Sequence, residues 1–446
     1  MLKKTCYIFS ALGLVLSLSC ATPPGADIRA AAGLANAVEF RDESLPTDAP
    51  PIANALDLPA AIERAVRQSP TLQAALGEVR AAQADARQSR LLPNPVLSIV
   101  FRYSKGGGSP VTETSLATDL AAALQAPRRI RVADNRLRAA SARAVAAAFD
   151  VIADTEKSYH TANALRQEVA LIEQGAGHIA RLLQIAQHRL DAGEGTRLNV
   201  ATLEARRAEI RIDLRERRLK LAQERLALAR LLGQPSGDTD WQQSTPLPVA
   251  APAWPEADWL AVALHNRPEI QADRWQLAAL EDGRALARLA LIESSAVGLD
   301  AEREGDWSLG PSLAVPLPLF DWGQARRAKA RALAIAARHR LTQTVRQTVQ
   351  EVRQAHAAQA KLAAAAGQAR GQLTPHQQQR VDLARAVYES GQSGITPLLL
   401  AELDVQKAQL RTVQLELRAA LASTELRRAS GGAAGNFKTK SNTQKQ

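Results

Sequence analysis

The cysteine side chains carry the most specific chemical signal in this sequence. There are two of them, Cys6 and Cys20. Cys6 lies in a short apolar segment after Lys3 and Lys4, which is the pattern of an export signal and is too short for a membrane-spanning helix. Because removal of residues 1–19 would leave one cysteine, the remaining chain could form no intrachain disulfide. A lone thiol at the end of a signal segment favours a lipid-attachment site at Cys20.

The residues around Cys20 support the same interpretation. Leu-Ser-Leu-Ser-Cys-Ala at 16–21 is similar to a bacterial lipobox, in which the cysteine becomes the acylated first residue of the mature chain. Ser17 stands where leucine is usual, so ordinary cleavage after Ala21 is the alternative. We predict a signal peptide at 1–19 and a lipid anchor at Cys20.

The other side chains with catalytic or metal-binding chemistry are scattered. No pair of histidines has the HExxH spacing or a zinc-ligand spacing with cysteine, and the sequence has neither a nucleotide-binding glycine-rich loop nor a nucleophile elbow. The sequence therefore predicts no enzyme, no cofactor and no metal site. The seven histidines are at positions 160, 178, 188, 265, 339, 356 and 376.

The charge of the chain does not indicate a nucleic-acid partner. Lys and Arg number 56 and Asp and Glu 45, for a formal net charge of +11. The two signs interleave along the helical segments, as on solvated helix faces, and no basic cluster with aromatic residues is present. We predict no binding to nucleic acid.

Two carboxylates, Asp300 and Glu302, alternate with apolar residues in a segment that we predict to be a β-strand. The same alternation predicts strands at 97–103, about 113–124, 297–302 and 307–319. Strands of this length with one apolar and one polar face are typical of transmembrane barrels, so we predict that Asp300 and Glu302 face a watery lumen. A small soluble sheet packed on helices is the alternative. Aromatic residues near the strand ends, as in interfacial girdles, are Phe101, Tyr103, Trp307, Phe320 and Trp322.

Long helical patterns flank these strands. The predicted helices cover 58–90, 127–190, 197–232, 257–291, 324–390 with an interruption near Gly371 and Pro375, and the residues after 396. Apolar residues over 165–190 are spaced alternately four and three apart, which predicts a coiled-coil seam. The helix at 197–232 has two apolar stripes, one through Ile210 and one through Ile212, so we expect it to have neighbours on two sides.

The chain is internally duplicated. Residues 69–74 resemble 267–272, and 188–193 resemble 386–391. The period is about 200 residues, far longer than a solenoid repeat. Each copy consists of a helix, a β-hairpin, a long helix and a return helix. We predict an extended arm at 20–56, a first repeat at 57–232, a linker at 233–256, a second repeat at 257–430 and a disordered tail at 431–446.

The predicted strands are too few to close a barrel, and open sheet edges are not tolerated in lipid. The helix with two stripes also needs lateral partners. Both features predict a hollow oligomer to which each chain contributes part of a barrel.

This layout resembles the TolC family of outer-membrane efflux factors over about residues 57–430. Residues 91–98, Leu-Leu-Pro-Asn-Pro-Val-Leu-Ser, and 388–391, Tyr-Glu-Ser-Gly, are similar to family patterns, the first to the CzcC/CusC-like branch that serves heavy-metal exporters. The resemblance implies a mainly α fold in a homotrimer, with a 12-strand outer-membrane β-barrel above a long periplasmic α-barrel. It also implies a periplasmic adaptor and an inner-membrane pump of the RND type as partners.

The resemblance places the adaptor contact at two tip turns, 191–197 and 390–396. The family narrows its periplasmic entrance with acidic residues just after the second turn, but Pro397 stands about where that aspartate would fall. The predicted tip residues are Gly193, Glu194, Gly195, Gly391, Gln392 and Gly394, and the candidate entrance residues are Asp191, Asn199, Glu402 and Asp404.

We therefore expect a passive outer-membrane conduit, anchored by lipid and extending into the periplasm, that exports heavy-metal cations. Two alternatives share the fold: efflux of drugs or other organic compounds, and a conduit for protein secretion. A periplasmic structural coiled-coil lipoprotein is an alternative of another class, although it leaves the strands in both copies unexplained.

Overall fold

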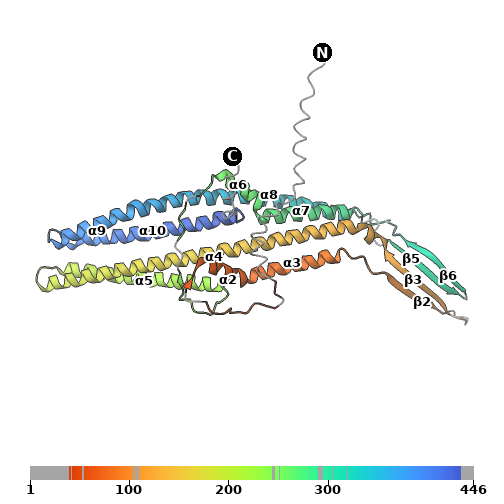
Figure 1. Cartoon of the computed structure of the whole chain (residues 1–446), viewed down its shortest axis with the longest axis horizontal. Coiled ribbons are helices and arrows are strands. Elements are labelled where there is room, and N and C mark those ends of the chain that lie inside the picture. Colours follow the sequence, from red (N-terminus) through yellow and green to blue (C-terminus); the bar gives the residue numbers. More distant parts are fainter. Residues whose placement is uncertain are drawn as a thin grey trace, which may run out of the picture.

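A computed structural model shows an elongated molecule with helices along most of its length and a sheet at one end (Figure 1). The helices that end at Asp191 and at Glu389 both reach the opposite end of the molecule, which we call the tip. The residues that the structure describes are 40–41, 43–52, 55–103, 105, 110–243, 247–250, 252–289, 295–304, 306–317 and 319–432.

The sheet at one end is built from two hairpins, one from each repeat. Its strands β2 (Val96–Arg102), β3 (Val111–Asp119), β5 (Ala296–Glu304) and β6 (Asp306–Ala314) are antiparallel and lie in the order β2-β3-β5-β6. The predicted strands are confirmed, and the hairpins join through β3 and β5. Strands β2 and β6 are therefore the open edges.

Two of the predicted strand ends were wrong. The second strand stops at Asp119, whose side chain accepts a 2.9 Å hydrogen bond from the Ala122 amide and so caps a helix that starts at Leu120. This helix includes Pro127, near which we had predicted its start. The fourth strand ends at Ala314, which pairs with Ala296, the first residue of β5.

One helix runs almost the whole length of the helical part. Helix α4 (Leu120–Asp191) has 72 residues, about 108 Å at 1.5 Å per residue. It turns back into α5 (Arg197–Leu231), which packs along its tip half. The second repeat has the same design, with α8 (Gln324–Gln368), α9 (Thr374–Glu389) and the return helix α10 (Ile395–Ala429). The interruption predicted near Gly371 is a single π-helical segment, Ala369–Leu373, rather than a break.

Each predicted N-terminal helix is in fact two helices. The first is α2 (Leu58–Arg67) followed by α3 (Pro70–Gln88), and its counterpart is α6 (Glu256–Asn266) followed by α7 (Pro268–Ala287). Proline at the first position of α3 and α7 explains both breaks, because it disfavours a helical conformation in the residue before it. Ser69 also caps α3 through the amide of Leu72. A short parallel pair, β1 (Ala55–Leu56) with β4 (Gln242–Gln243), lies beside α2.

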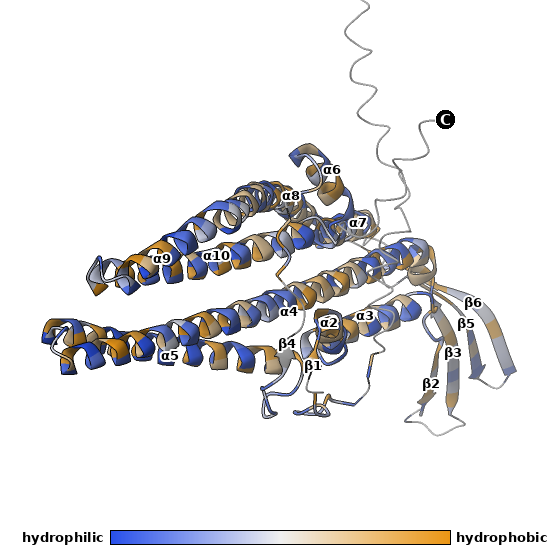
Figure 2. Cartoon of the chain, turned by 60° about the vertical axis from the view of Figure 1, so that its left-hand side comes forward, coloured by the Kyte–Doolittle hydropathy of each residue, from blue (hydrophilic) through white to orange (hydrophobic). Residues whose placement is uncertain are grey.

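The cores are small and follow the helix seams. Near the tip, Ile172, Ile179, Leu203, Ile210 and Leu398 belong to a cluster shared by α4, α5, α9 and α10. At mid-length one cluster surrounds Tyr159 and another surrounds Trp259. The helices alternate hydrophilic and hydrophobic residues along their length (Figure 2). In the part of the chain that the structure describes, no helix has both the length and the apolar character to cross a membrane.

The two stripes of α5 differ in their surroundings. Ile210 and Leu228 are buried against α4, whereas Ile212, Leu219 and Leu226 are 57%, 59% and 52% exposed. One predicted neighbour is therefore α4, and the second face of α5 is open in the single chain.

Candidate channel, entrance and mid-length sites

The register of the sheet separates an apolar from a polar face. One cross-strand row consists of Leu97, Leu116, Leu299 and Pro311. The next row, on the opposite face, consists of Ser98, Ser115, Asp300 and Gly310. Most of the large apolar side chains of the first face are exposed, so nothing in the single chain covers that face.

The two predicted lumen residues, Asp300 and Glu302, both lie on the polar face, two rows apart. Asp300 accepts a 3.0 Å hydrogen bond from the Ser312 hydroxyl. Glu302 lies directly opposite Glu113 of β3, a like-charge pairing that destabilises a sheet unless it is balanced. Arg102 balances it through a 2.5 Å ion pair with Glu113. The polar face of the sheet therefore has an excess of carboxylates.

Both tip turns have the same helix-ending geometry. Gly193 and Gly391 have φ angles of 80° and 74°, the left-handed region that glycine reaches without steric cost. The Gly193 amide donates to the Leu190 carbonyl at 3.0 Å, and the Glu194 amide donates to the Arg189 carbonyl at 2.8 Å. Gly391 and Gln392 repeat this pair of bonds, so each turn is a Schellman motif.

A side-chain contact joins the helix ends that precede the two tip turns. The Arg189 guanidinium of α4 lies 4.4 Å from the ring centroid of Tyr388 in α9, a cation–π contact. Tyr388 is buried in the tip cluster together with Ile395. Gly195 packs against the α4 backbone, where an added Cβ would lie 2.7 Å from the Leu190 nitrogen, whereas Gly394 has open space around it.

The candidate entrance residues differ in how far they are already paired. Glu402 is nearly buried, between Arg385 at 2.9 Å and His178 at 3.2 Å. Asp404 forms a 2.7 Å ion pair with Arg380. Asp191 accepts only a weak hydrogen bond from Gln187, and Asn199 lies in the first turn of α5 with its amide bonded to Thr196. Asp191 is the exposed one of the four candidates, and neither it nor Asn199 forms an ion pair with another described residue.

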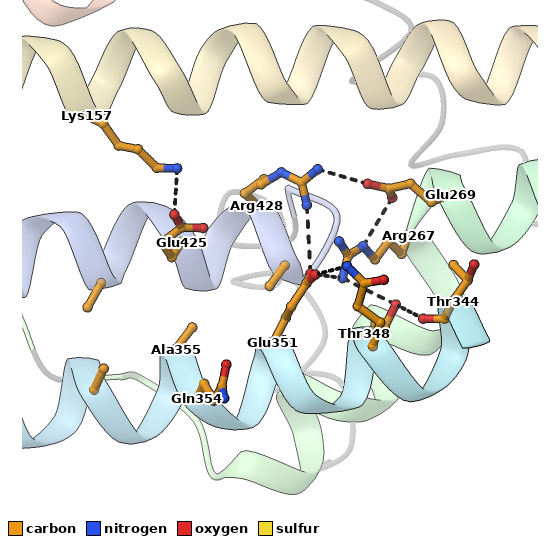
Figure 3. Close-up of a pocket in the computed structure, with 14 residues that line it drawn as sticks. Lys157, Arg267, Glu269, Thr344, Thr348, Glu351, Gln354, Ala355, Glu425 and Arg428 are labelled. Atoms are coloured by element: carbon orange, nitrogen blue, oxygen red, sulfur yellow. Dashed lines mark hydrogen bonds and ion pairs between the residues drawn. The ribbon is translucent and has the colours of Figure 1, made fainter. Parts of the chain in front are cut away.

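A mid-length ionic network was not predicted. Arg267, buried at the start of α7, forms ion pairs with Glu269 at 3.2 Å and Glu351 at 2.5 Å. Arg428 of α10 joins the same two glutamates (Figure 3). It also pairs with Asp150 of α4, so it ties the second repeat to the first. Its pKa is raised by these carboxylates, which outweigh the opposing effect of burial. A polar groove of about 750 Å³ borders the network.

The signal for this network was present in the sequence but weak. Arg267 occupies the place of Ser69 in the repeat, so the second copy replaced a helix cap by a charge. The members of the network come from α4, α7, α8 and α10, which are far apart in the sequence, and only the fold brings them together. Its positive and negative groups are mutually paired, which indicates a structural role.

His160 is a second mid-length residue of unusual character. It is fully buried in α4, and neither ring nitrogen has a hydrogen-bond partner among the described residues. Burial, together with the smaller effect of the positive charge of Arg427, lowers the pKa of His160 to about 4. His160 is therefore neutral in the folded protein near neutral pH.

The described residues contain no cluster of histidine, cysteine and carboxylates that could hold a metal ion. Cys20 and the rest of 1–39 lie outside the described residues, as does most of the predicted tail.

Comparison with known proteins connects these features to a family. Residues 259–432 match the family model described as outer membrane efflux protein. The cobalt-zinc-cadmium resistance protein CzcC of Cupriavidus metallidurans is 26% identical over 61% of this chain and 65% of its own length. The pyoverdine export outer membrane protein OpmQ of Pseudomonas aeruginosa is 26% identical over 84% of this chain and 85% of its own. The second repeat of the chain is therefore similar to outer membrane efflux proteins.

The fold of the chain agrees with that of a solved structure. It superposes on the outer membrane protein VceC of Vibrio cholerae with a TM-score of 0.70 at 21% identity, over 84% of this chain and 96% of VceC. Its mainly helical architecture with a small sheet is that of TolC-like outer membrane channels. The chain spans just under two thirds of the length of CzcC.

Proposed function

We propose that this protein is the outer-membrane channel of a tripartite efflux system and that it exports heavy-metal cations. One observation carries the proposal: two duplicated helical hairpins end in a sheet whose apolar face is exposed and whose edges, β2 and β6, are open. Such a sheet is stable in lipid only as part of a closed barrel. The chain supplies no energy source, so it acts as a passive conduit.

The assembly that satisfies these features is a homotrimer. Edge β6 of one copy pairs with edge β2 of the next, which closes the sheet into a barrel of three hairpin pairs. The exposed stripe of α5 then packs on a neighbouring copy. Adaptor contact is assigned to the two Schellman turns at the tip, and the pump of the RND type delivers substrate below them. Lipid attached to Cys20 adds a second membrane anchor.

Two features support metal cations as the substrate. CzcC, which is named for resistance to cobalt, zinc and cadmium, is among the relatives. The polar face of the sheet carries Glu113, Asp300 and Glu302 against Arg102, which gives the barrel interior a net attraction for cations. Export of an organic compound is the second candidate, because OpmQ matches over more of the chain.

Transport tests the proposal. Deletion of the gene is expected to raise sensitivity to zinc, cobalt, cadmium or copper, and the intact gene should restore resistance. A gene lacking the tip turn 390–396 should give trimers in the outer membrane without restoring resistance. Sensitivity confined to hydrophobic drugs would keep the channel and reject the metal substrate. If deletion changes neither, the efflux role itself is rejected.

A further inference from the structure

The junction between sheet and helices carries exposed apolar and aromatic side chains. The connection from β6 to α8 exposes Leu317, Leu319 and Trp322, and Phe320 is 91% exposed. Across the sheet, Leu91 and Leu92 are exposed in the connection from α3 to β2. These residues continue the apolar face of the sheet toward the helices.

We call the exposed apolar and aromatic residues of these two connections the apolar belt. Basic residues lie directly on its helix side. Between Asp321 and Glu351 the sequence has basic residues and no acidic one. Lys329 and Arg331 are exposed near the start of α8, and no hydrogen bond or ion pair joins them to another described residue. We call the exposed cations at the four sheet–helix junctions the basic collar; its members are Arg90, Arg131, Arg288, Lys329 and Arg331.

We propose that the basic collar binds the headgroups of anionic phospholipids at the periplasmic surface of the outer membrane. The inference rests on the proposed insertion of the sheet in the membrane. If the apolar belt lies in lipid, the collar lies at headgroup level, where long cationic side chains and aromatic rings are favoured. Each lysine or arginine near an anionic membrane surface strengthens binding about fivefold, and salt weakens it.

The charges at this level favour lipid over a second copy of the chain. Asp134 is paired with Arg90 at 2.8 Å, Asp282 with Arg131 at 3.2 Å, and Glu281 with Arg338 at 2.6 Å. A neighbouring copy would present the same paired carboxylates. These paired carboxylates would neutralise Lys329 and Arg331 less than a phospholipid phosphate, which is free to approach both.

Lipid retention by the purified trimer tests this inference. Wild type, Lys329→Gln/Arg331→Gln and Arg340→Gln/Arg346→Gln are delipidated and incubated in neutral detergent with equal amounts of phosphatidylglycerol and phosphatidylcholine. Lipid retained after gel filtration is then quantified at low and high salt. The second variant is the matched control, because Arg340 and Arg346 are exposed cations of the same helix farther from the sheet.

We expect wild type to retain phosphatidylglycerol preferentially at low salt. The Lys329→Gln/Arg331→Gln variant should lose at least about fivefold of this preference, while the control keeps it. Equal retention of both lipids by wild type, equal preference in the two variants, or loss of the trimer in the collar variant alone would overturn the inference. Outer-membrane fractionation of the same variants separates this failure from that of the proposed function, since the latter predicts trimers in the membrane whatever lipid they retain.

Discussion

The buried imidazole of His160 makes stability depend on pH. Its folded-state pKa of about 4 lies below the ordinary value of 6.5, so the unfolded chain takes up a proton between these values and the folded protein does not. Stability is therefore lost as pH falls, by about 2 kcal/mol between pH 7 and 5 and fully only below pH 4. His160→Phe removes the titrating group from a site where neither nitrogen has a described partner. We expect its thermal unfolding midpoint, followed by circular dichroism, to vary less with pH than that of wild type.

The control for this substitution is His339→Phe, at an exposed position of α8. Its side chain is hydrated in both states, so it should follow the wild-type pH profile. A His160→Phe protein with the full wild-type dependence would show that other groups cause the loss.

At the scale of elements, the tip turn after α9 depends on one left-handed residue. Gly391 has a φ of 74°, and an added Cβ would meet nothing within 4 Å, so alanine there adds backbone strain without a clash. We expect Gly391→Ala to destabilise the turn by about 1 kcal/mol and to speed amide hydrogen exchange in the last turn of α9 about fivefold. Gly394→Ala is the matched control, because Gly394 has a φ of −72° and the same open space. Equal exchange in the two variants would contradict the assignment of a Schellman turn.

The elements also show what the sequence could predict. The strands could be predicted from alternation, because successive side chains of β2 or β5 point to opposite faces of the sheet. The long helices could be predicted from their apolar seams, because the helical period repeats over many turns. The start of α4 was missed because the residues from Leu120 to Ala126 fit either state, and the deciding signal, Asp119 as a cap, is local. The network around Arg428 could not be read, because its partners on α4, α7 and α8 meet only after folding.

At the scale of the whole molecule, the exposed stripe of α5 decides whether copies meet along their helices. Leu219, in the middle of this stripe, is 59% exposed in the single chain, and its burial by a neighbour would contribute about 2 kcal/mol per copy. Leu219→Glu replaces this contact by a buried charge and is expected to reduce the trimer band on unheated denaturing gels. Lys220→Glu is the control, because Lys220 is the next residue and lies outside the stripe of Ile212, Leu219 and Leu226. It should leave the trimer band unchanged, although it changes the net charge of the helix more than Leu219→Glu does. If both variants form trimers as wild type does, the sheet edges alone hold the assembly, and the second stripe of α5 has another partner.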